Sequence, residues 1–472
     1  MQPRPLHGFE KVMYQMSPTL GAATVAAVVS QEIPMHTVRQ AAERVQHLFP
    51  QLRSRITKHS EDRAPHIELI PKEKVDIEYT VLDFGVAYDE SHQERNELAR
   101  ILAQTCSRPF DPTNGCMYRV LIGKFASPHT FVCVSADHTL ADGITLMKVL
   151  MLIMEYCGSP PADSDDPGNQ LPTHSKRNEI SPYQQLGFRW YERLLSVPIR
   201  IQWSKVVRNS VVHQLHPDKA QGTGGVVTLD IGRTEMTSYS RLKELSRPLG
   251  ISTAGYLLAA SICAFLIFVR QVRPGLVTEK IDLRDASVDF NLGARLDPPL
   301  SGVEGGLWTG LLSYNRHVAL SEKIALLCRK TTARIHGRLS VREAAYVNLA
   351  SQGIENYIEF MRRSLKNENF SGPVSSLNMS WLGDVDRLKS SNSIERLFGC
   401  HGTPTGGALF QFWVAVVKDR FDFAIGAHNT LVSQKELQPV RNSFEWFLDN
   451  PEEILRGTSS VGDFLNQWQE SE

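Results

Sequence analysis

A histidine, a carboxylate and a glycine stand close together in the segment His138–Gly143, which reads His-Thr-Leu-Ala-Asp-Gly. A histidine side chain titrates near neutral pH and commonly takes a proton from a reacting group. Asp142, four residues later, can hold the turn through backbone N–H groups or an arginine partner. Gly143 allows the backbone to approach a substrate closely. The residue types and their spacing therefore predict a general base at His138.

The neighbouring sequence predicts the elements that would position this histidine. Apolar runs over 118–125 and 130–136 are typical of a strand hairpin that ends directly before His138. From Ile144 to Met154, apolar residues recur at helical spacing and predict a helix with a broad buried face. Upstream, the patterns predict a helix over 37–48, a strand over 52–56 and a second helix over 94–106. We therefore expect His138 where a strand ends and a helix begins, able to reach into a cleft.

A change of composition divides the chain into two units. Residues 157–182 are rich in Gly, Pro, Ser, Asp and Asn, which is typical of a linker or a surface excursion. Strand and helix patterns alternate again from Gly225 onward. We expect an α/β fold of two similar lobes, with residues 1–182 as the N-terminal lobe and 225–472 as the C-terminal lobe. The connecting segment, 183–224, is helix-like over 183–195 and irregular beyond.

Composition narrows the class of protein. The 51 Lys and Arg residues balance the 51 Asp and Glu residues, which argues against nucleic acid as a partner. Seven scattered cysteines without a CxxC pair favour a reducing compartment, so we expect a cytoplasmic protein. The longest apolar stretch, Gly255–Val269, is shorter than the roughly 18 residues that a membrane-spanning helix needs, and no transmembrane segment is expected. The apolar run over 20–29 is interpreted as an early strand.

The segment Asp137–Gly143 resembles the HHxxxDG motif of the condensation-domain and CoA-dependent acyltransferase superfamily. That superfamily includes the condensation domains of nonribosomal peptide synthetases, polyketide-associated acyltransferases and alcohol acyltransferases. Asp137 stands where the family has its first motif histidine. Further segments resemble family motifs in the same order along the chain: Phe49–Arg55, Arg108–Asp111, Gly115–Val120, Ile281–Arg284 and Gly306–Gly310. The resemblance therefore covers roughly residues 5–450.

This resemblance implies two chloramphenicol-acetyltransferase-like lobes that form a pseudo-dimer, with the active site in a tunnel between them. It implies that His138 takes a proton from a hydroxyl or amine acceptor. The acceptor would attack the thioester of an acyl-CoA or a phosphopantetheinyl acyl carrier protein, the co-substrate, to form an ester or an amide. No covalent enzyme intermediate, bound cofactor or metal is implied. Asp142 would support the site structurally by pairing with Arg53.

Other site residues follow from the same resemblance. The N–H near Gly143 is the first candidate for stabilising the oxyanion, with the hydroxyls of Ser380 or Ser376 as alternatives. The expected partners are the acyl thioester donor, a small alcohol or amine acceptor and a carrier protein, for a monomeric enzyme of secondary-metabolite or lipid biosynthesis. Three residues are expected to line the tunnel: Asp137, Asn378 and Trp381.

Two other functions remain open on the sequence. The altered motif at Asp137 suggests a carrier-protein binding module that has lost catalysis. A relative could also use the same cleft for cyclisation or epimerisation. Intact His138, Asp142 and Gly143 favour acyl transfer over a binding role.

Overall fold

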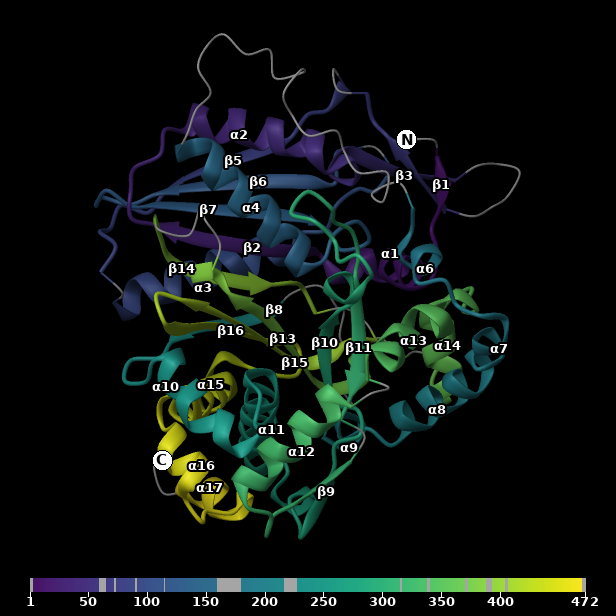
Figure 1. Ribbon diagram of the computed structural model, residues 1–472, viewed down its shortest axis with the longest axis vertical. Helices are drawn as coiled ribbons and strands as arrows, with labels where there is room; N and C mark the ends of the chain where they lie inside the picture. Colours follow the sequence, from purple (N-terminus) through teal and green to yellow (C-terminus); the bar gives the residue numbers. More distant parts are fainter. Residues whose placement is uncertain are drawn as a thin grey trace.

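The first lobe is built on a sheet of five strands, seen in the upper half of the computed structural model in Figure 1. The strand order is β14-β2-β7-β6-β5, with bounds β2 (Ala22–Val29), β5 (Glu78–Asp83), β6 (Tyr118–Lys124), β7 (Thr130–Asp137) and β14 (Ile394–Cys400). β6 and β7 pair antiparallel, with Val120 opposite Val134, so the expected hairpin is confirmed. The structure describes residues 3–58, 65–71, 74–89, 91–113, 115–158, 180–215, 227–314, 316–337, 340–368, 370, 372–387, 393–403 and 406–468.

Helices cover both faces of this sheet. α2 (Met35–Leu48) and α4 (Gly143–Gly158) share a core with one face, and α3 (His92–Ser107) packs on the other. Because both faces are covered, all eight residues of β2 and all eight of β7 are buried. The expected early strand is β2. His138 therefore follows the last residue of a central, fully packed strand.

The second lobe contains a sheet of six strands in the order β11-β10-β13-β15-β16-β8. Its largest core joins this sheet to α11 (Thr253–Val272), α12 (Ile324–His336) and α15 (Gln434–Asp449). The strands are β8 (Val227–Arg233), β10 (Ser287–Asn291), β11 (Thr309–Ser313), β13 (Ser375–Asp384), β15 (Ala408–Val417) and β16 (Arg420–His428). The remaining elements here are α10 (Tyr239–Ser246), α16 (Pro451–Arg456) and α17 (Val461–Gln467), with the pair β9 (Lys280–Asp282) and β12 (His317–Ala319).

One strand of the first sheet comes from the second half of the chain. β14 lies between β13 and β15 in sequence, yet it pairs antiparallel with β2, and Phe398 stands opposite Ala26. A small sheet of β1 (Arg4–Pro5), β4 (Pro65–Leu69) and β3 (Ser54–Lys58) completes the first lobe. The ranges 1–182 and 225–472 divide the chain by sequence position. The sheets do not divide at the same place, because β14, from the second range, is a strand of the first sheet. The mixed α/β, two-lobed fold expected from the sequence is confirmed.

Within the described residues, α11 is the one helix that length and composition alone would allow to cross a membrane. Of its most apolar 18 residues, 83% are buried inside the protein. The helix is longer than the apolar stretch seen in the sequence because Ser252 caps it, accepting a hydrogen bond from the Gly255 N–H (3.1 Å). Its burial makes α11 a core helix of the second lobe.

The expected connecting segment is helical and lies at one side of the molecule (Figure 1). It forms α6 (Pro182–Gln185), α7 (Trp190–Leu194), α8 (Ser196–Arg208) and α9 (Val211–Leu215). α8 contacts α13 (Ser340–Gln352) and α14 (Tyr357–Leu365), and both of these contact α1 (Phe9–Leu20). Residues 196–208 were expected to be irregular, but they form the helix α8. Pro198 is tolerated because it lies in the first turn of α8, where a proline removes no intrahelical hydrogen bond. Residues 159–179 and 216–226, which include most of the expected linker, lie outside the described residues.

Two boundaries differ from the sequence prediction for local reasons. The strand expected over 52–56 begins two residues later, because Pro50 starts a 3-10 turn that runs to Arg53. The segment Asn378–Gly383 lies within the long strand β13, which pairs parallel with β15, and the register shifts between Trp381 and Gly383. A cluster of Asn and Gly is equally typical of a turn, so composition alone could not distinguish the two.

Candidate active site

The turn that follows β7 presents His138. Asp137 is fully buried, and its carboxylate accepts hydrogen bonds from the Thr139 N–H (2.9 Å) and from the Ser17 hydroxyl of α1. The Asp137 carbonyl accepts a further bond from the Leu140 N–H (3.0 Å). These contacts close a tight turn and direct the His138 side chain out of the sheet. Asp137 thus builds the turn that orients the histidine.

His138 lies on the wall of a partly open cavity of about 700 Å³ between the two lobes. The first lobe contributes His138 and α1, and the second contributes β10, β11, β13, β15 and α13. α8 forms a further part of the wall, so the segment between the lobes also borders the site. A cavity of this size is typical of a small-molecule site. The histidine predicted to act as a base is therefore accessible from this cavity.

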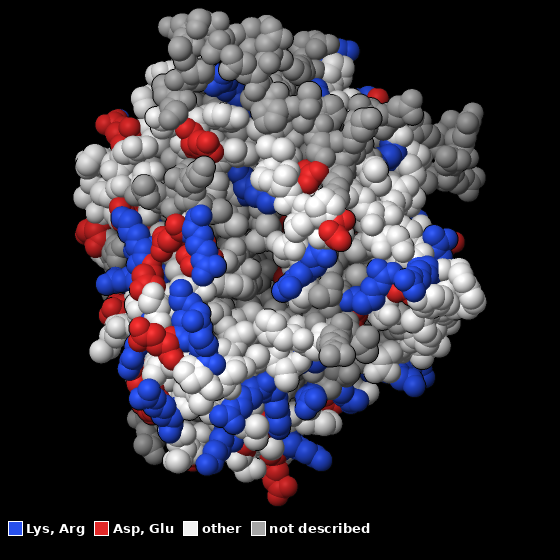
Figure 2. Space-filling model, viewed as in Figure 1, with Lys and Arg blue, Asp and Glu red and all other residues white. Residues whose placement is uncertain are grey.

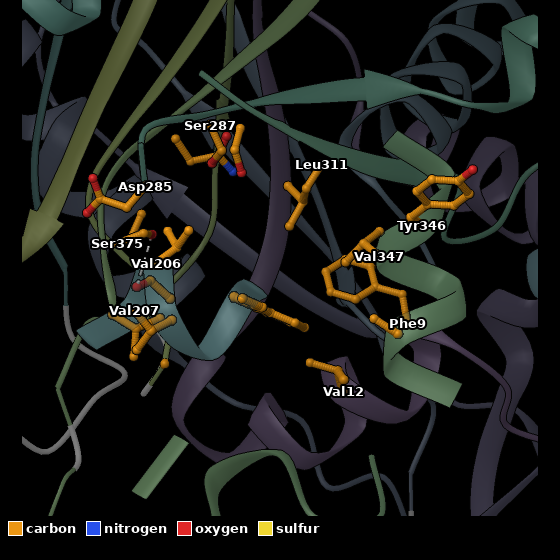
Figure 3. Close-up of a pocket in the computed structure, with 18 of the residues that line it drawn as sticks. Phe9, Val12, Val206, Val207, Asp285, Ser287, Leu311, Tyr346, Val347 and Ser375 are labelled. Atoms are coloured by element: carbon orange, nitrogen blue, oxygen red, sulfur yellow. Dashed lines mark hydrogen bonds between the residues drawn. The ribbon is translucent and has the colours of Figure 1, made fainter. Parts of the chain in front are cut away.

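In Figure 3 the labelled side chains are mostly apolar on one side of the cavity, whereas on the other side polar side chains lie among valines. Phe9 and Val12 of α1 and Val347 of α13 lie on one side. Asp285 and Ser375 lie on the opposite side, and Val206 of α8 borders them. An apolar group and a polar group of one ligand could therefore be held at the same time.

A second histidine contacts His138. The ring of His401, which follows β14, lies 5.3 Å from the His138 ring, centroid to centroid, with the planes at 64°. Burial, reinforced by the charge of His138, lowers the pKa of His401 to about 3. Nδ1 of His401 lies 2.7 Å from the Gly402 carbonyl, so Nδ1 carries the proton and the ring is neutral. His401 therefore places an uncharged imidazole against His138.

A buried acid of β10 also faces this site. Asp289 accepts hydrogen bonds from the Asn378 side-chain amide (3.0 Å) and from the Ser380 hydroxyl. Burial raises the pKa of Asp289, while these two bonds and the positive charge of His138 act in the opposite direction. The carboxylate thus interacts electrostatically with His138 and can stabilise the imidazolium form.

The motif carboxylate Asp142 joins the two lobes. Its Oδ1 accepts the Thr145 N–H at 2.8 Å, which caps α4, and its Oδ2 accepts the Trp308 N–H of the second lobe, also at 2.8 Å. The Asp142 N–H donates to the Gly306 carbonyl (3.1 Å). The Thr145 hydroxyl donates to the same carbonyl (2.9 Å) and accepts the Gly306 N–H (3.1 Å). We call this set of contacts between residues 142–145 and 306–308 the lobe clasp.

Glycines leave room for close packing in and beside the clasp. A Cβ at Gly305 would lie 2.5 Å from Cγ2 of Thr145, and a Cβ at Gly143 would lie 3.2 Å from Cδ2 of Leu382. Gly306 has φ near +144°, a conformation that side chains disfavour. The Gly-Leu-Trp-Thr-Gly segment singled out in the sequence is thus the second-lobe half of the clasp.

The other predicted support residues have these positions. Arg53 ends the 3-10 turn and donates to the Ile70 carbonyl (3.5 Å), and its pairing with Asp142 stays a prediction. Gly143 is the first residue of α4, where an N–H has no intrahelical acceptor. The hydroxyls of Ser380 and Ser376 donate to Asp289 and Asp285, respectively. Of the oxyanion candidates, the two serines therefore already have carboxylate partners.

The three residues expected to line the tunnel have different environments. Asn378 lies on the cavity wall. Asp137 instead bonds to Ser17 and Thr139, as described above. The Trp381 ring packs against the second-lobe core, 6.4 Å from the Phe421 ring. Side chains alternate along β13, so Asn378 and Trp381, three residues apart, point to opposite faces.

Sequence reasoning missed His401 and Asp289. Each carries a local signal, because Asp289 is a lone acid between Val288 and Phe290 in a strand, and His401 directly follows the apolar strand β14, as His138 follows β7. Nothing local relates them to His138. In the part of the chain that the structure describes, no group of three His, Cys, Asp or Glu side chains could hold a metal ion.

No protein-family model matches the sequence, and no curated protein matches it significantly. Solved structures do match its fold. The condensation domain of the monacolin K polyketide synthase aligns with 98% of this chain and 99% of its own, at a TM-score of 0.62 and 10% identity. The starter condensation domain of rhizomide synthetase, solved as a double mutant in complex with C8-CoA and Leu-SNAC, aligns with 98% and 96%, at a TM-score of 0.60 and 10% identity.

The chain has the condensation-domain fold. The epimerization domain from the third module of tyrocidine synthetase B shares the fold, with a TM-score of 0.56, 10% identity, and coverage of 96% of this chain and 98% of that one. The alignments span both lobes, which confirms at the level of fold the resemblance that the motifs predicted. Because condensation and epimerization domains share one fold, the chemistry must be argued from the site.

Proposed function

We propose that this protein is an acyltransferase, which moves an acyl group from a thioester to a hydroxyl or amine acceptor. One observation carries the proposal: His138 directly follows the central strand β7 and lies on the wall of a cavity of about 700 Å³ between the two lobes of a condensation-domain fold. A base on the wall of a cavity between two lobes can meet a donor and an acceptor that the two lobes hold together.

In the proposed reaction, His138 takes the proton of the acceptor as its oxygen or nitrogen attacks the thioester carbonyl. The tetrahedral intermediate then collapses, the C–S bond breaks, and the proton passes from the imidazolium to the leaving thiolate. The products are an ester or amide and a free thiol. The acyl group passes directly from donor to acceptor, and no covalent bond to the protein forms.

The surroundings of His138 support this role. During transfer the ring becomes a cation, and the Asp289 carboxylate can stabilise it. His401 stays neutral near pH 7, so it adds no competing positive charge. Asp142, through the lobe clasp, keeps the turn of the first lobe fixed against the second lobe. The oxyanion donor is proposed to be the N–H at Gly143, the start of α4, where the helix dipole favours negative charge.

The donor is proposed to be an acyl-CoA or an acyl carrier protein, in secondary-metabolite or lipid biosynthesis. One structure of the same fold was solved in complex with C8-CoA and Leu-SNAC. The apolar side of the cavity, with Phe9, Val12 and Val347, suits an acyl chain. The polar side, with Asp285 and Ser375, suits the acceptor.

The test measures thiol release and product formation from a panel of acyl-CoA donors with alcohol and amine acceptors. His138→Ala should lower kcat by at least about 100-fold, because general-base catalysis typically contributes that much. His36→Ala is the matched control, since His36 is an exposed histidine of α2 and should leave kcat unchanged.

Three outcomes separate the alternatives. Equal product from the wild type and His138→Ala would refute the assignment of the base. Failure of the wild type with every donor, together with tight binding of a carrier protein, would instead support a binding module. Release of a racemised or cyclised product without transfer would support the third function, because an epimerization domain also has this fold.

A further inference from the structure

The helices between the lobes carry an apolar stripe on their outer face. Four large apolar side chains are well exposed there: Trp190 (75%), Leu194 (66%), Val197 (51%) and Ile201 (53%). Their spacing of four, three and four residues is the helical repeat, and Leu195, the single residue between α7 and α8, has helical backbone angles (φ −70°, ψ −14°), so the four side chains lie along one face of these two consecutive helices. We call these four residues the outer stripe. Exposed apolar side chains that form such a contiguous row mark a surface that contacts something else.

The outer stripe cannot be explained by the core of this protein. The opposite face of α8, with Ile199, Trp203 and Val206, lines the cavity or packs beside it. α8 is therefore apolar on both faces. A helix with two apolar faces is expected to be covered on both, and the protein itself covers one.

Basic side chains accompany the stripe. Residues 189–208 contain five arginines or lysines and a single acid, Glu192, in a chain whose total charge is balanced. Glu192 is buried and paired with Arg342, so it does not offset the outer charges. The basic residues Arg193, Lys205 and Arg208 are exposed. Figure 2 shows white surface with blue side chains beside it, at the edge where Figure 1 places α7 and α8.

We propose that the outer stripe docks on the surface of an anionic lipid membrane. Amphipathic helices that bind in the interface present Trp and Leu to the acyl region and Lys and Arg to anionic headgroups, which is the combination found here. A second copy of the chain fits less well. A two-fold symmetric contact would bring the same basic residues of both copies together.

The outer stripe lies close to the cavity on the same two helices. Leu195 and Pro198 are exposed, and both also line the cavity wall. They lie on α7–α8 between the outer stripe and the cavity-facing side chains of α8. The docked surface would thus lie next to the site. The proposal itself rests on the stripe and its charges, and it does not depend on the acyltransferase function.

The test is flotation of the full chain with vesicles. Vesicles of phosphatidylcholine alone are compared with vesicles that also contain phosphatidylserine, at about 0.15 M and about 1 M salt. The wild type should float with the anionic vesicles, float less with the neutral ones, and lose binding at the higher salt. The double variant Leu194→Asp/Ile201→Asp should bind the anionic vesicles at least about 10-fold less, because two apolar side chains leave the interface and two negative charges enter it.

A matched control carries the same two charges elsewhere. Val81 and Met236 are exposed apolar residues away from α7–α8, and Val81→Asp/Met236→Asp should bind as the wild type does. His138→Ala should also bind normally, which separates a failure of docking from a failure of the proposed chemistry. Circular dichroism checks that both double variants fold. The proposal is overturned if the wild type floats with neither vesicle, if Leu194→Asp/Ile201→Asp floats like the wild type, or if light scattering shows a dimer that this variant dissociates.

Discussion

Replacing Asp142 by alanine removes the carboxylate of the lobe clasp. Two N–H groups, of Thr145 and Trp308, each lose an acceptor at 2.8 Å. Asp142 is 3% exposed, so water cannot easily take the place of its oxygens. A buried donor left without a partner costs about 1–3 kcal/mol, and the pair therefore costs about 2–6 kcal/mol in free energy of unfolding. The midpoint of urea unfolding should fall accordingly.

The same change should lower activity without removing the base. A misplacement of about 1 Å at a reacting centre costs about 100-fold in rate. We therefore expect kcat of Asp142→Ala to fall by about 100-fold, while the pH dependence of kcat keeps the shape seen in the wild type, because His138 remains. The assay is thiol release from the donor that the wild type uses, over a range of pH.

Thr145→Val tests whether Asp142 acts through the clasp. Valine keeps the shape of threonine but loses the two hydrogen bonds between the Thr145 hydroxyl and Gly306. The loss should be smaller, about 1–3 kcal/mol for two neutral bonds, with a smaller fall in kcat. Since both changes weaken one contact, the effect of the double variant should be less than the sum of the single effects. Full stability of Asp142→Ala with an altered pH profile would refute the clasp and assign Asp142 to proton transfer.

Two further predictions concern the residues that face His138. Asp289→Asn should lower kcat by about 100-fold because the His138 imidazolium loses the carboxylate that stabilises it. Asp285 is a second buried acid of the cavity, and Asp285→Asn should have a smaller effect on kcat. Equal effects of the two changes would contradict the role of Asp289. Between pH 6.5 and about 3, the unfolded chain binds a proton on His401 that the folded protein excludes, so this residue reduces stability as the pH falls. His401→Gln should therefore show a shallower loss of thermal stability below pH 6.5, and an unchanged slope would contradict the buried neutral state.

Local patterns in the sequence were sufficient to predict most of the helices and strands near the site. The β6–β7 hairpin, the helix after Gly143 and the position of His138 between them were all predictable. Hairpin strands and a helix start depend on residues within a few positions of one another, where periodicity and turn chemistry operate. The failure at residues 196–208 is also local, because apolar residues on both faces of α8 leave no clear helical periodicity and Pro198 lies near its start.

Contacts between distant segments could not be predicted in this way. β14 joins the first sheet across more than 360 residues of chain, and it thereby brings His401 to His138. Asp142 bonds to Trp308, 166 residues away, through a backbone N–H that no side-chain pattern reveals. Asp289 shares the cavity with the histidine only because β10 lies in the sheet that faces the cavity.

The sequence by itself therefore determined the candidate base, its turn and the elements that flank it, together with motifs whose order indicated the fold. Only the tertiary structure decided what surrounds that base: a neutral histidine, a buried carboxylate and a clasp between lobes. The physical reason is that the neighbours and the burial of His138 depend on how two sheets pack against each other. Such packing is set by many side chains at once, and each of them shows in the sequence only its own local preference.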